Sequence, residues 1–224
     1  MRYGAPVRVL GIDPGSRHTG YGVVESKGGR LKLLACGTLS PGEGLPIASR
    51  LAAIDRGLRE VVTRLAPEAA SVEEVYHAVN ARSALVLGQA RGVAMVAAAS
   101  ASIEVFEYSA SEIKRAVSGS GRAGKEQVAR MVAMLLGVEA PGDEHACDAI
   151  AAAICHLNRT RIPASSSGAK PIEALPAVKS ATVSSGAPRR GTRGASAMQR
   201  ARPAVIPPAP ATAGRRQGRV GTKR

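Results

Sequence analysis

The sequence predicts a mixed α/β fold in which helices cover both faces of one sheet. Three strand-like segments come first, helical and strand-like segments then alternate, and helical patterns end the ordered part. Hydrophobic residues make up 45% of the 224 residues, which is enough to bury the core of one ordinary domain. The apolar periodicity stops near Arg161. We therefore predict one domain over residues 1–161 and a tail over residues 162–224.

The first three elements are predicted strands joined by tight turns. Residues 7–13 (VRVLGID) form an apolar run that is typical of a buried strand, and residues 19–26 and 30–40 are the next two strands. The turn-forming sequences PGS and KGG separate them.

The middle of the chain alternates between helix and strand. Residues 45–68 have Pro46 near a helix start and apolar side chains at helical spacing. A short strand is predicted over residues 69–76, a second helix over residues 83–102 and a fifth strand over residues 103–108.

Three further helices complete the domain. Ser109 and Glu112 form a candidate capping box for a short helix over residues 111–117. After a glycine-rich stretch, the last two helices span residues 125–137 and 145–161. This order of elements predicts a mixed sheet with five strands.

The net charge of +14 is concentrated in the tail. Residues 1–161 contain 19 Lys and Arg against 16 Asp and Glu, whereas residues 162–224 contain 12 against one. The tail is rich in Ala, Pro, Ser and Arg and lacks apolar periodicity, so we expect it to be disordered. A basic balance of this size favours polyanionic partners, with nucleic acid first and an anionic membrane surface second.

Membrane insertion and secretion are not expected. No apolar run approaches the roughly 18 residues that a spanning helix requires. The start, MRYGAPVRVLGID, does not have the pattern of a secretory signal, so a cytoplasmic location is predicted.

The cysteines Cys36, Cys147 and Cys155 are odd in number and have no short paired spacing. We therefore expect buried small hydrophobic residues rather than disulfides. A zinc site formed by Cys147 and Cys155 with His145 and His156 is the alternative.

Asp13 ends the first predicted strand, where Pro14 and Gly15 force a turn. A carboxylate at this position can stabilise a turn, or it can belong to the phosphate loop of an actin-like ATPase, whose first strand and hairpin are similar. By itself this residue does not distinguish these possibilities.

Three blocks read together are much more specific. GIDPGSRHTGYGV (11–23), VEEVYHAVNARSALVLGQARGVA (72–94) and EHACDAIAAAICH (144–156) closely resemble, at these separations, the signature blocks of the RuvC family. The resemblance covers nearly all of residues 7–157. It implies a ribonuclease H-like fold, a homodimer, four-way (Holliday) junction DNA as substrate, and the RuvA and RuvB branch-migration complex as partner.

The resemblance also implies a catalytic cluster of four metal-binding side chains. Matched by position, they are Asp13, Glu73, His145 and Asp148. Two Mg²⁺ ions, which Mn²⁺ can replace, would activate a water and neutralise the leaving oxygen in phosphodiester hydrolysis. Mg²⁺ prefers oxygen ligands, which agrees with carboxylates from separate elements, and the spacing of His145 and Asp148 puts both on one helix face.

Two positions in this cluster leave alternatives. His145 stands where many relatives have Asp, so it is either a direct ligand or a proton shuttle. It can also be a helix-start histidine bonded to backbone, with Asp143 or Glu144 as substitute ligand. Glu73 and Glu74 are neighbours on a strand and point to opposite faces, and the family match selects Glu73.

The resemblance places four residues near the DNA. Tyr76 matches an aromatic that stacks on an unpaired base, and Asn80 matches a position near the DNA. Lys114 and Lys125 match DNA-contacting positions near the site, where they would bind phosphate. The alternatives are a core aromatic, a helix cap and solvated surface charge. Gly88 and Gly92 allow close approach of a second helix; the resemblance implies that their helix forms the dimer interface, and packing on its own sheet is the alternative.

The predicted function is therefore a crossover junction endonuclease. It would make paired symmetric nicks during recombination and repair, leaving 5′-phosphate and 3′-hydroxyl ends. An actin-like ATPase would need further nucleotide-binding loops. A non-catalytic junction-binding protein remains the other alternative, should His145 fail to bind metal.

Overall fold

The computed structural model describes residues 5–42, 44–74, 80–139 and 142–161. The predicted disordered tail lies outside this part of the chain. The sheet has the order β3-β2-β1-β4-β5. β1 is antiparallel to β2 and β2 to β3, whereas β1, β4 and β5 are parallel. The strands are β1 (Val7–Asp13), β2 (Thr19–Lys27), β3 (Arg30–Leu39), β4 (Ala69–Glu73) and β5 (Glu104–Tyr108).

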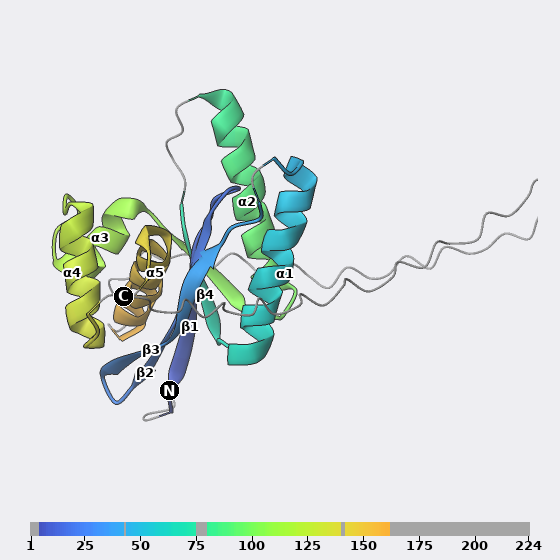
Figure 1. Ribbon diagram of the computed structural model, residues 1–224. Helices are drawn as coiled ribbons and strands as arrows, with labels where there is room; N and C mark the ends of the chain where they lie inside the picture. Colours follow the sequence, from blue (N-terminus) through green and yellow to red (C-terminus); the bar gives the residue numbers. More distant parts are fainter. Residues whose placement is uncertain (1–4, 43, 75–79, 140–141, 162–224) are drawn as a thin grey trace, which may run out of the picture. The chain divides into compact units, whose positions relative to one another are not determined.

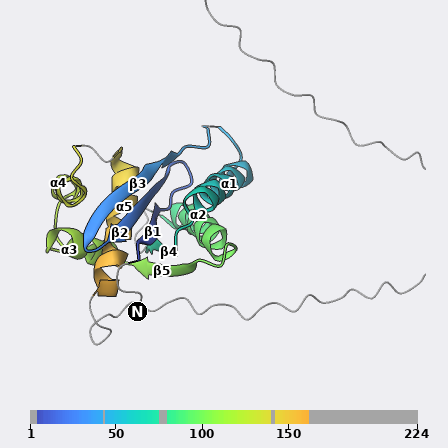
Figure 2. The ribbon, with the colours of Figure 1, turned by 90° about the horizontal axis from the view of Figure 1, so that it is seen from below.

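Helices cover both faces of this sheet, as predicted. In Figures 1 and 2, α1 and α2 lie on one face, and α3, α4 and α5 lie on the other. This arrangement confirms the mixed five-stranded sheet flanked by helices. The helices are α1 (Ile47–Leu65), α2 (Ala81–Ala99), α3 (Ala110–Ser118), α4 (Lys125–Leu136) and α5 (Glu144–Arg161).

Each face of the sheet has its own apolar core. Val9 of β1 packs in the cluster that contains Ile150 and Ile154 of α5. Its neighbour Leu10 packs in the other cluster, which contains Ile54 of α1. Successive side chains of a strand point to opposite faces, so an uninterrupted apolar run serves both cores.

The helix α5 lies directly on glycines of β1 and β2. A Cβ on Gly11 would lie 1.8 Å from the backbone oxygen of Ala149, and one on Gly20 would lie 2.0 Å from that of His145. A Cβ on Gly22 would lie 2.5 Å from the side chain of Ile150. We call Gly11, Gly20 and Gly22 the glycine floor. It lets the backbone of α5 approach the sheet more closely than any side chain would allow.

Several local predictions are confirmed and others shift by a few residues. The Ser109–Glu112 capping box is present at the start of α3. β4 ends at Glu73, earlier than expected, and α2 begins at Ala81, two residues before the expected start. Asn80 caps α2, because its side chain accepts a hydrogen bond from the Ser83 amide at 2.9 Å.

Cys147, Cys155 and His156 are buried in the core between α5 and the sheet. His156 Nδ1 is hydrogen-bonded to the Tyr108 hydroxyl at 2.9 Å, and the His156 ring packs on Phe106. Cys147 and Cys155 are thus buried as predicted, whereas Cys36 on β3 is only half-buried. Among the described residues, no helix is both long and apolar enough to cross a bilayer.

Candidate active site

The topology brings Asp13 and Glu73 to the same edge of the sheet. Asp13 is the last residue of β1 and Glu73 the last of β4, and these strands are parallel neighbours. The carboxyl ends of adjacent parallel strands meet at one edge. The first two turns of α5 add His145 and Asp148, and the backbone of His145 lies against Gly20 near the start of β2.

The four predicted ligands line one open cleft of about 710 Å³. Its wall includes residues from both strands and from α3, α4 and α5. The charged and polar side chains that line it include Asp13, His18, Glu73, Glu74, Lys114, Lys125, Glu144, His145 and Asp148. Residues separated by up to 135 positions in sequence thus meet in one place.

Burial, with added negative charge nearby, raises the pKa of the predicted carboxylate ligands in this cleft. Burial raises the pKa of Glu73 to about 7, with further contributions from the negative charges of Asp13 and Asp148. Burial and then the charge of Asp13 raise the pKa of Asp148. The pKa of Asp13 is also raised by burial, although its hydrogen bond with His145 opposes the shift. A half-buried cluster of this kind has excess negative charge that a cation would neutralise.

His145 contacts Asp13 directly. Its Nδ1 lies 2.9 Å from Asp13 Oδ2, so this pair of atoms forms a hydrogen bond. Among the described residues, no three His, Cys, Asp or Glu side chains are arranged to hold one ion together. The side chains line the cleft but do not converge on one point. They comprise three carboxylates and one imidazole, a set of donors that fits a divalent cation preferring oxygen ligands.

Both predicted lysines line the cleft. Lys125 at the start of α4 forms an ion pair with Glu144 at the start of α5. Lys114 and Lys125 each lower the pKa of Glu73. The lysines therefore supply positive charge beside the carboxylate cluster, where a phosphate backbone would need it.

The two alternative ligands, Asp143 and Glu144, have other partners. Asp143 Oδ1 accepts a hydrogen bond from the Ala146 amide at 2.9 Å and from the Thr38 hydroxyl at 2.7 Å. Asp143 thus caps α5 and joins its start to β3. These hydrogen bonds hold the pKa of Asp143 below its usual range.

Two predicted DNA contacts, Tyr76 and Asn80, and the alternative carboxylate Glu74 have different outcomes. Tyr76 lies outside the described residues. Asn80 caps α2, which is the alternative that the sequence left open. Glu74 lines the cleft together with Glu73, although the alternation along a strand predicted opposite faces. The reason is that β4 ends at Glu73, so the alternation does not extend to Glu74.

The sequence did not single out His18. This residue lies in the loop between β1 and β2, and its ring stacks on that of His145. Its only sequence signal is its place in the block GIDPGSRHTGYGV, which says nothing of its contacts. The role of Thr38 was likewise missed, since it lies outside all three blocks.

Comparisons with known proteins agree with this geometry. A family model described as crossover junction endodeoxyribonuclease RuvC matches residues 9–156. The proteins of that name from Anaeromyxobacter sp. (strain Fw109-5) and Anaeromyxobacter dehalogenans (strain 2CP-C) are 48% identical over 202 residues and 53% identical over 161 residues. These alignments cover 89% and 72% of this chain, and 88% and 86% of the relatives.

A solved structure is similar as well. Thermus thermophilus RuvC in complex with a Holliday junction substrate matches with a TM-score of 0.69 and 38% identity, over 74% of this chain and 99% of that chain. This likeness confirms the expected ribonuclease H-like fold. With a family match across nearly the whole of the described domain, the chain belongs to the RuvC family of crossover junction endodeoxyribonucleases.

Proposed function

We propose that this protein resolves four-way DNA junctions by metal-dependent phosphodiester hydrolysis at the cleft between β1, β4 and α5. The observation that carries the proposal is that all four family-matched residues, Asp13, Glu73, His145 and Asp148, line this one cleft. Products with 5′-phosphate and 3′-hydroxyl ends would follow from hydrolysis at the phosphorus–O3′ bond, and such ends can be rejoined by a ligase.

The carboxylates would hold the metal. Dependence on divalent metal is general in this family. Two Mg²⁺ or Mn²⁺ ions bound here would supply water activation and neutralisation of the leaving oxygen. Asp13 would hold metal together with Glu73 and Asp148, and its charge raises the pKa of both of these carboxyl groups.

His145 has one nitrogen still available. With Nδ1 bonded to Asp13, Nε2 is the atom that can bind metal or carry a proton. A carboxylate that accepts from Nδ1–H stabilises the tautomer in which Nε2 has a lone pair. The contact with Asp13 thus supports both predicted roles.

The DNA would be held by phosphate contacts at the cleft. Lys114 and Lys125 line it on the side of α3 and α4, where they would bind backbone oxygens. Tyr76 and Asn80 stay predictions, the first as a base-stacking residue and the second as a residue near the DNA in addition to its capping role. The cytoplasmic location and the RuvA and RuvB partnership also stay predictions.

A homodimer would bring two such clefts to one junction. α2 exposes Leu85 and Val96, whose surfaces are 70% and 56% accessible. A Cβ on Gly88 or Gly92 would meet nothing within 4 Å among the described residues, so packing against this part of the chain does not require these glycines. Their use in close contact with the same helix of a second copy explains them better.

The dimer is testable by sedimentation. Leu85→Asp should shift the protein towards monomer and uncouple the two nicks, because it places a charge in an apolar contact. Val7→Asp, at an exposed apolar site on β1, is the matched control and should stay dimeric. If the Leu85→Asp protein sediments with the same dimer mass as the wild type, an interface on α2 is contradicted.

The activity is tested with a synthetic four-way junction and a linear duplex of the same sequence. With Mg²⁺ or Mn²⁺, paired nicks should appear in the junction at symmetric positions, and the duplex should remain intact. Binding of the junction without cleavage in either metal would instead favour a non-catalytic junction-binding protein.

A further inference from the structure

His18 lies against His145, although no ligand position in the proposed metal site requires it. The two ring centroids are 5.4 Å apart, and the ring planes differ by 18°. This geometry is a stacked pair at the usual separation for aromatic rings. Both residues line the cleft, so the contact is made at its wall.

The loop that carries His18 has a tightly defined backbone. The Thr19 side chain is fully buried, and its hydroxyl donates to the Gly15 carbonyl at 2.5 Å. A Cβ on Gly15 would lie 2.2 Å from the backbone oxygen of His18. Only glycine therefore fits there, and the compact loop brings His18 back towards the cleft.

A second contact, a hydrogen bond at one ring nitrogen, also holds the His18 ring. His18 Nδ1 is hydrogen-bonded to Ser40 Oγ at 3.0 Å, and Ser40 directly follows β3. Thr38, two residues earlier, donates to Asp143 at the start of α5. The end of β3 thus contacts both His18 and the cap of the helix that bears His145.

We propose that His18 is a positioning residue for His145. Its ring covers one face of the His145 imidazole, and Ser40 keeps that ring in place. The His145 ring is then restricted to the plane in which Nδ1 meets Asp13. A ligand held in its binding orientation loses less rotamer freedom when metal binds. This inference rests on the proposed function, because it assumes that His145 serves the metal site.

The test measures Mn²⁺ affinity of the full-length protein by calorimetry without DNA. Replacing His18 with alanine should weaken Mn²⁺ binding by about two- to tenfold, the range expected for removing one aromatic pair. His18→Phe keeps a flat ring and should restore most of the affinity. Ser40→Ala should give a smaller loss in the same direction. Thermal stability should be unchanged in all three variants, because His18 and Ser40 are exposed.

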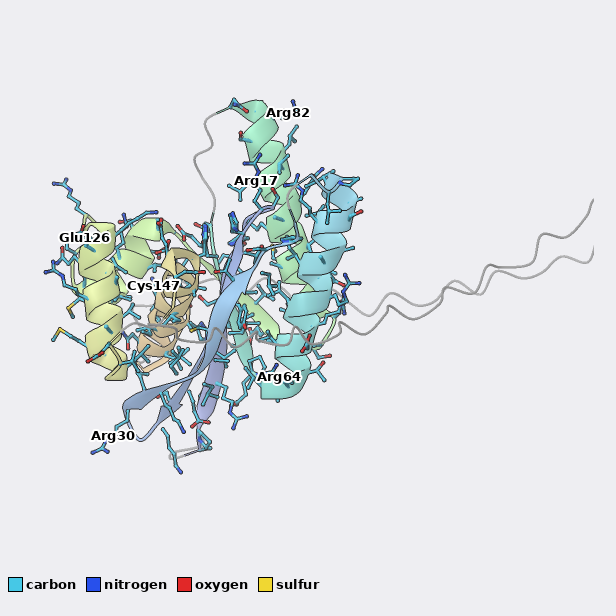
Figure 3. All side chains as sticks on the ribbon, viewed as in Figure 1. Arg17, Arg30, Arg64, Arg82, Glu126 and Cys147 are labelled. Carbon is cyan, nitrogen blue, oxygen red and sulfur yellow. The ribbon has the colours of Figure 1, made fainter. Side chains whose placement is uncertain are left out.

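Two controls separate positioning from other roles. Arg30→Ala is a control that should behave as wild type. Arg30 is exposed and lies at the opposite end of the sheet from Arg17, the residue that precedes His18, as Figure 3 shows. Thr38→Val removes a bond to the α5 cap, so it should lower stability, unlike Ser40→Ala. In a His145→Ala background, removing His18 should have no further effect on Mn²⁺ affinity.

Unchanged Mn²⁺ affinity in His18→Ala would overturn the proposal. So would a His18→Phe protein as weak as His18→Ala, since the imidazole nitrogens rather than the ring plane would then matter. If His145→Ala leaves both Mn²⁺ affinity and cleavage unchanged, the assigned role of His145 fails as well. A defect in His145→Ala without one in His18→Ala rejects only the positioning role.

Discussion

Asp13 is a partly buried carboxyl group in a cluster with two other carboxyl groups, Glu73 and Asp148. Burial raises its pKa, and its own negative charge in turn raises the pKa of Glu73 and of Asp148. Such an arrangement is unfavourable without a cation and favourable with one. We therefore expect this carboxylate cluster to bind a cation. Lys114 and Lys125, which line the same cleft, supply part of the positive charge that the cluster needs.

Asp13→Asn should abolish cleavage while changing junction affinity by no more than about threefold, because binding rests on basic contacts and shape. Parallel measurements of nicking rate and of junction binding in Ca²⁺ would check this. Glu68→Gln, a substitution of an exposed acid outside the cleft, serves as the control. Nicking by the Asp13 variant near the wild-type rate would remove this residue from the active site.

At the scale of elements, the docking of α5 on the sheet decides the site. Gly20 lies opposite Asp13 in the β1–β2 register, and the backbone of His145 lies on it. Any side chain at Gly20 would push the first turn of α5 away from Asp13. The cap by Asp143 and Thr38 fixes the same turn from the side of β3.

Gly20→Ala should cost about 1–3 kcal/mol of unfolding free energy or more, because the added methyl meets backbone rather than a movable side chain. It should also reduce Mn²⁺ affinity. Gly22→Ala is the matched comparison, since its nearest contact is the Ile150 side chain. Urea unfolding and calorimetry should find both variants destabilised, with the greater loss of metal binding at Gly20. Equal metal affinity in the two variants would contradict this account of how α5 is seated.

The buried His156 links α5 to β5 and makes stability depend on pH. Burial lowers the pKa of His156 to about 4, whereas an unfolded histidine titrates near 6.5. Below pH 6.5 the unfolded chain therefore binds a proton that the folded protein excludes. Stability should fall as the pH falls from about 6.5 to 4, by up to about 3 kcal/mol from this residue.

His156→Gln tests this contribution, because glutamine can still bond to the Tyr108 hydroxyl but does not titrate. Urea unfolding at pH 7.5 and pH 5 should give a smaller difference for the variant than for the wild type. The same pH dependence in both proteins would assign the acid sensitivity to other groups.

For the whole molecule, charge is divided between a mildly basic domain and a strongly basic tail. Binding of phosphates by the tail would raise the affinity for DNA without favouring junctions over linear duplex, because the release of counterions favours binding to any duplex. All proposed ligands lie before Arg161. Cleavage position and general affinity should therefore be separable.

Deleting residues 163–224 should flatten the salt dependence of DNA binding, by roughly 0.9 in the log-log slope for each phosphate that the tail neutralises. The truncated protein should still cut junctions at the same phosphates. Filter binding across a salt series, with cut sites mapped on a sequencing gel, measures both quantities. A moved cut site, or an inactive protein with an unchanged slope, would mean that the tail is a folded or partner-docking element.

The sequence by itself determined the order of elements, the mixed sheet and the family blocks. These depend on local periodicity, turn residues and short motifs, as in the strand that ends at Asp13 and the capping box at Ser109. It could not determine that Glu74 shares the cleft or that Asn80 caps α2, because strand and helix ends depend on what surrounds them.

Only the tertiary structure decided which distant residues meet. The stacking of His18 on His145 and the bond from Thr38 to Asp143 join segments more than 100 residues apart. The roles of Gly11 and Gly20 appear only when α5 lies on them. The physical reason is that close approach is a property of two surfaces together, so neither segment's pattern contains it.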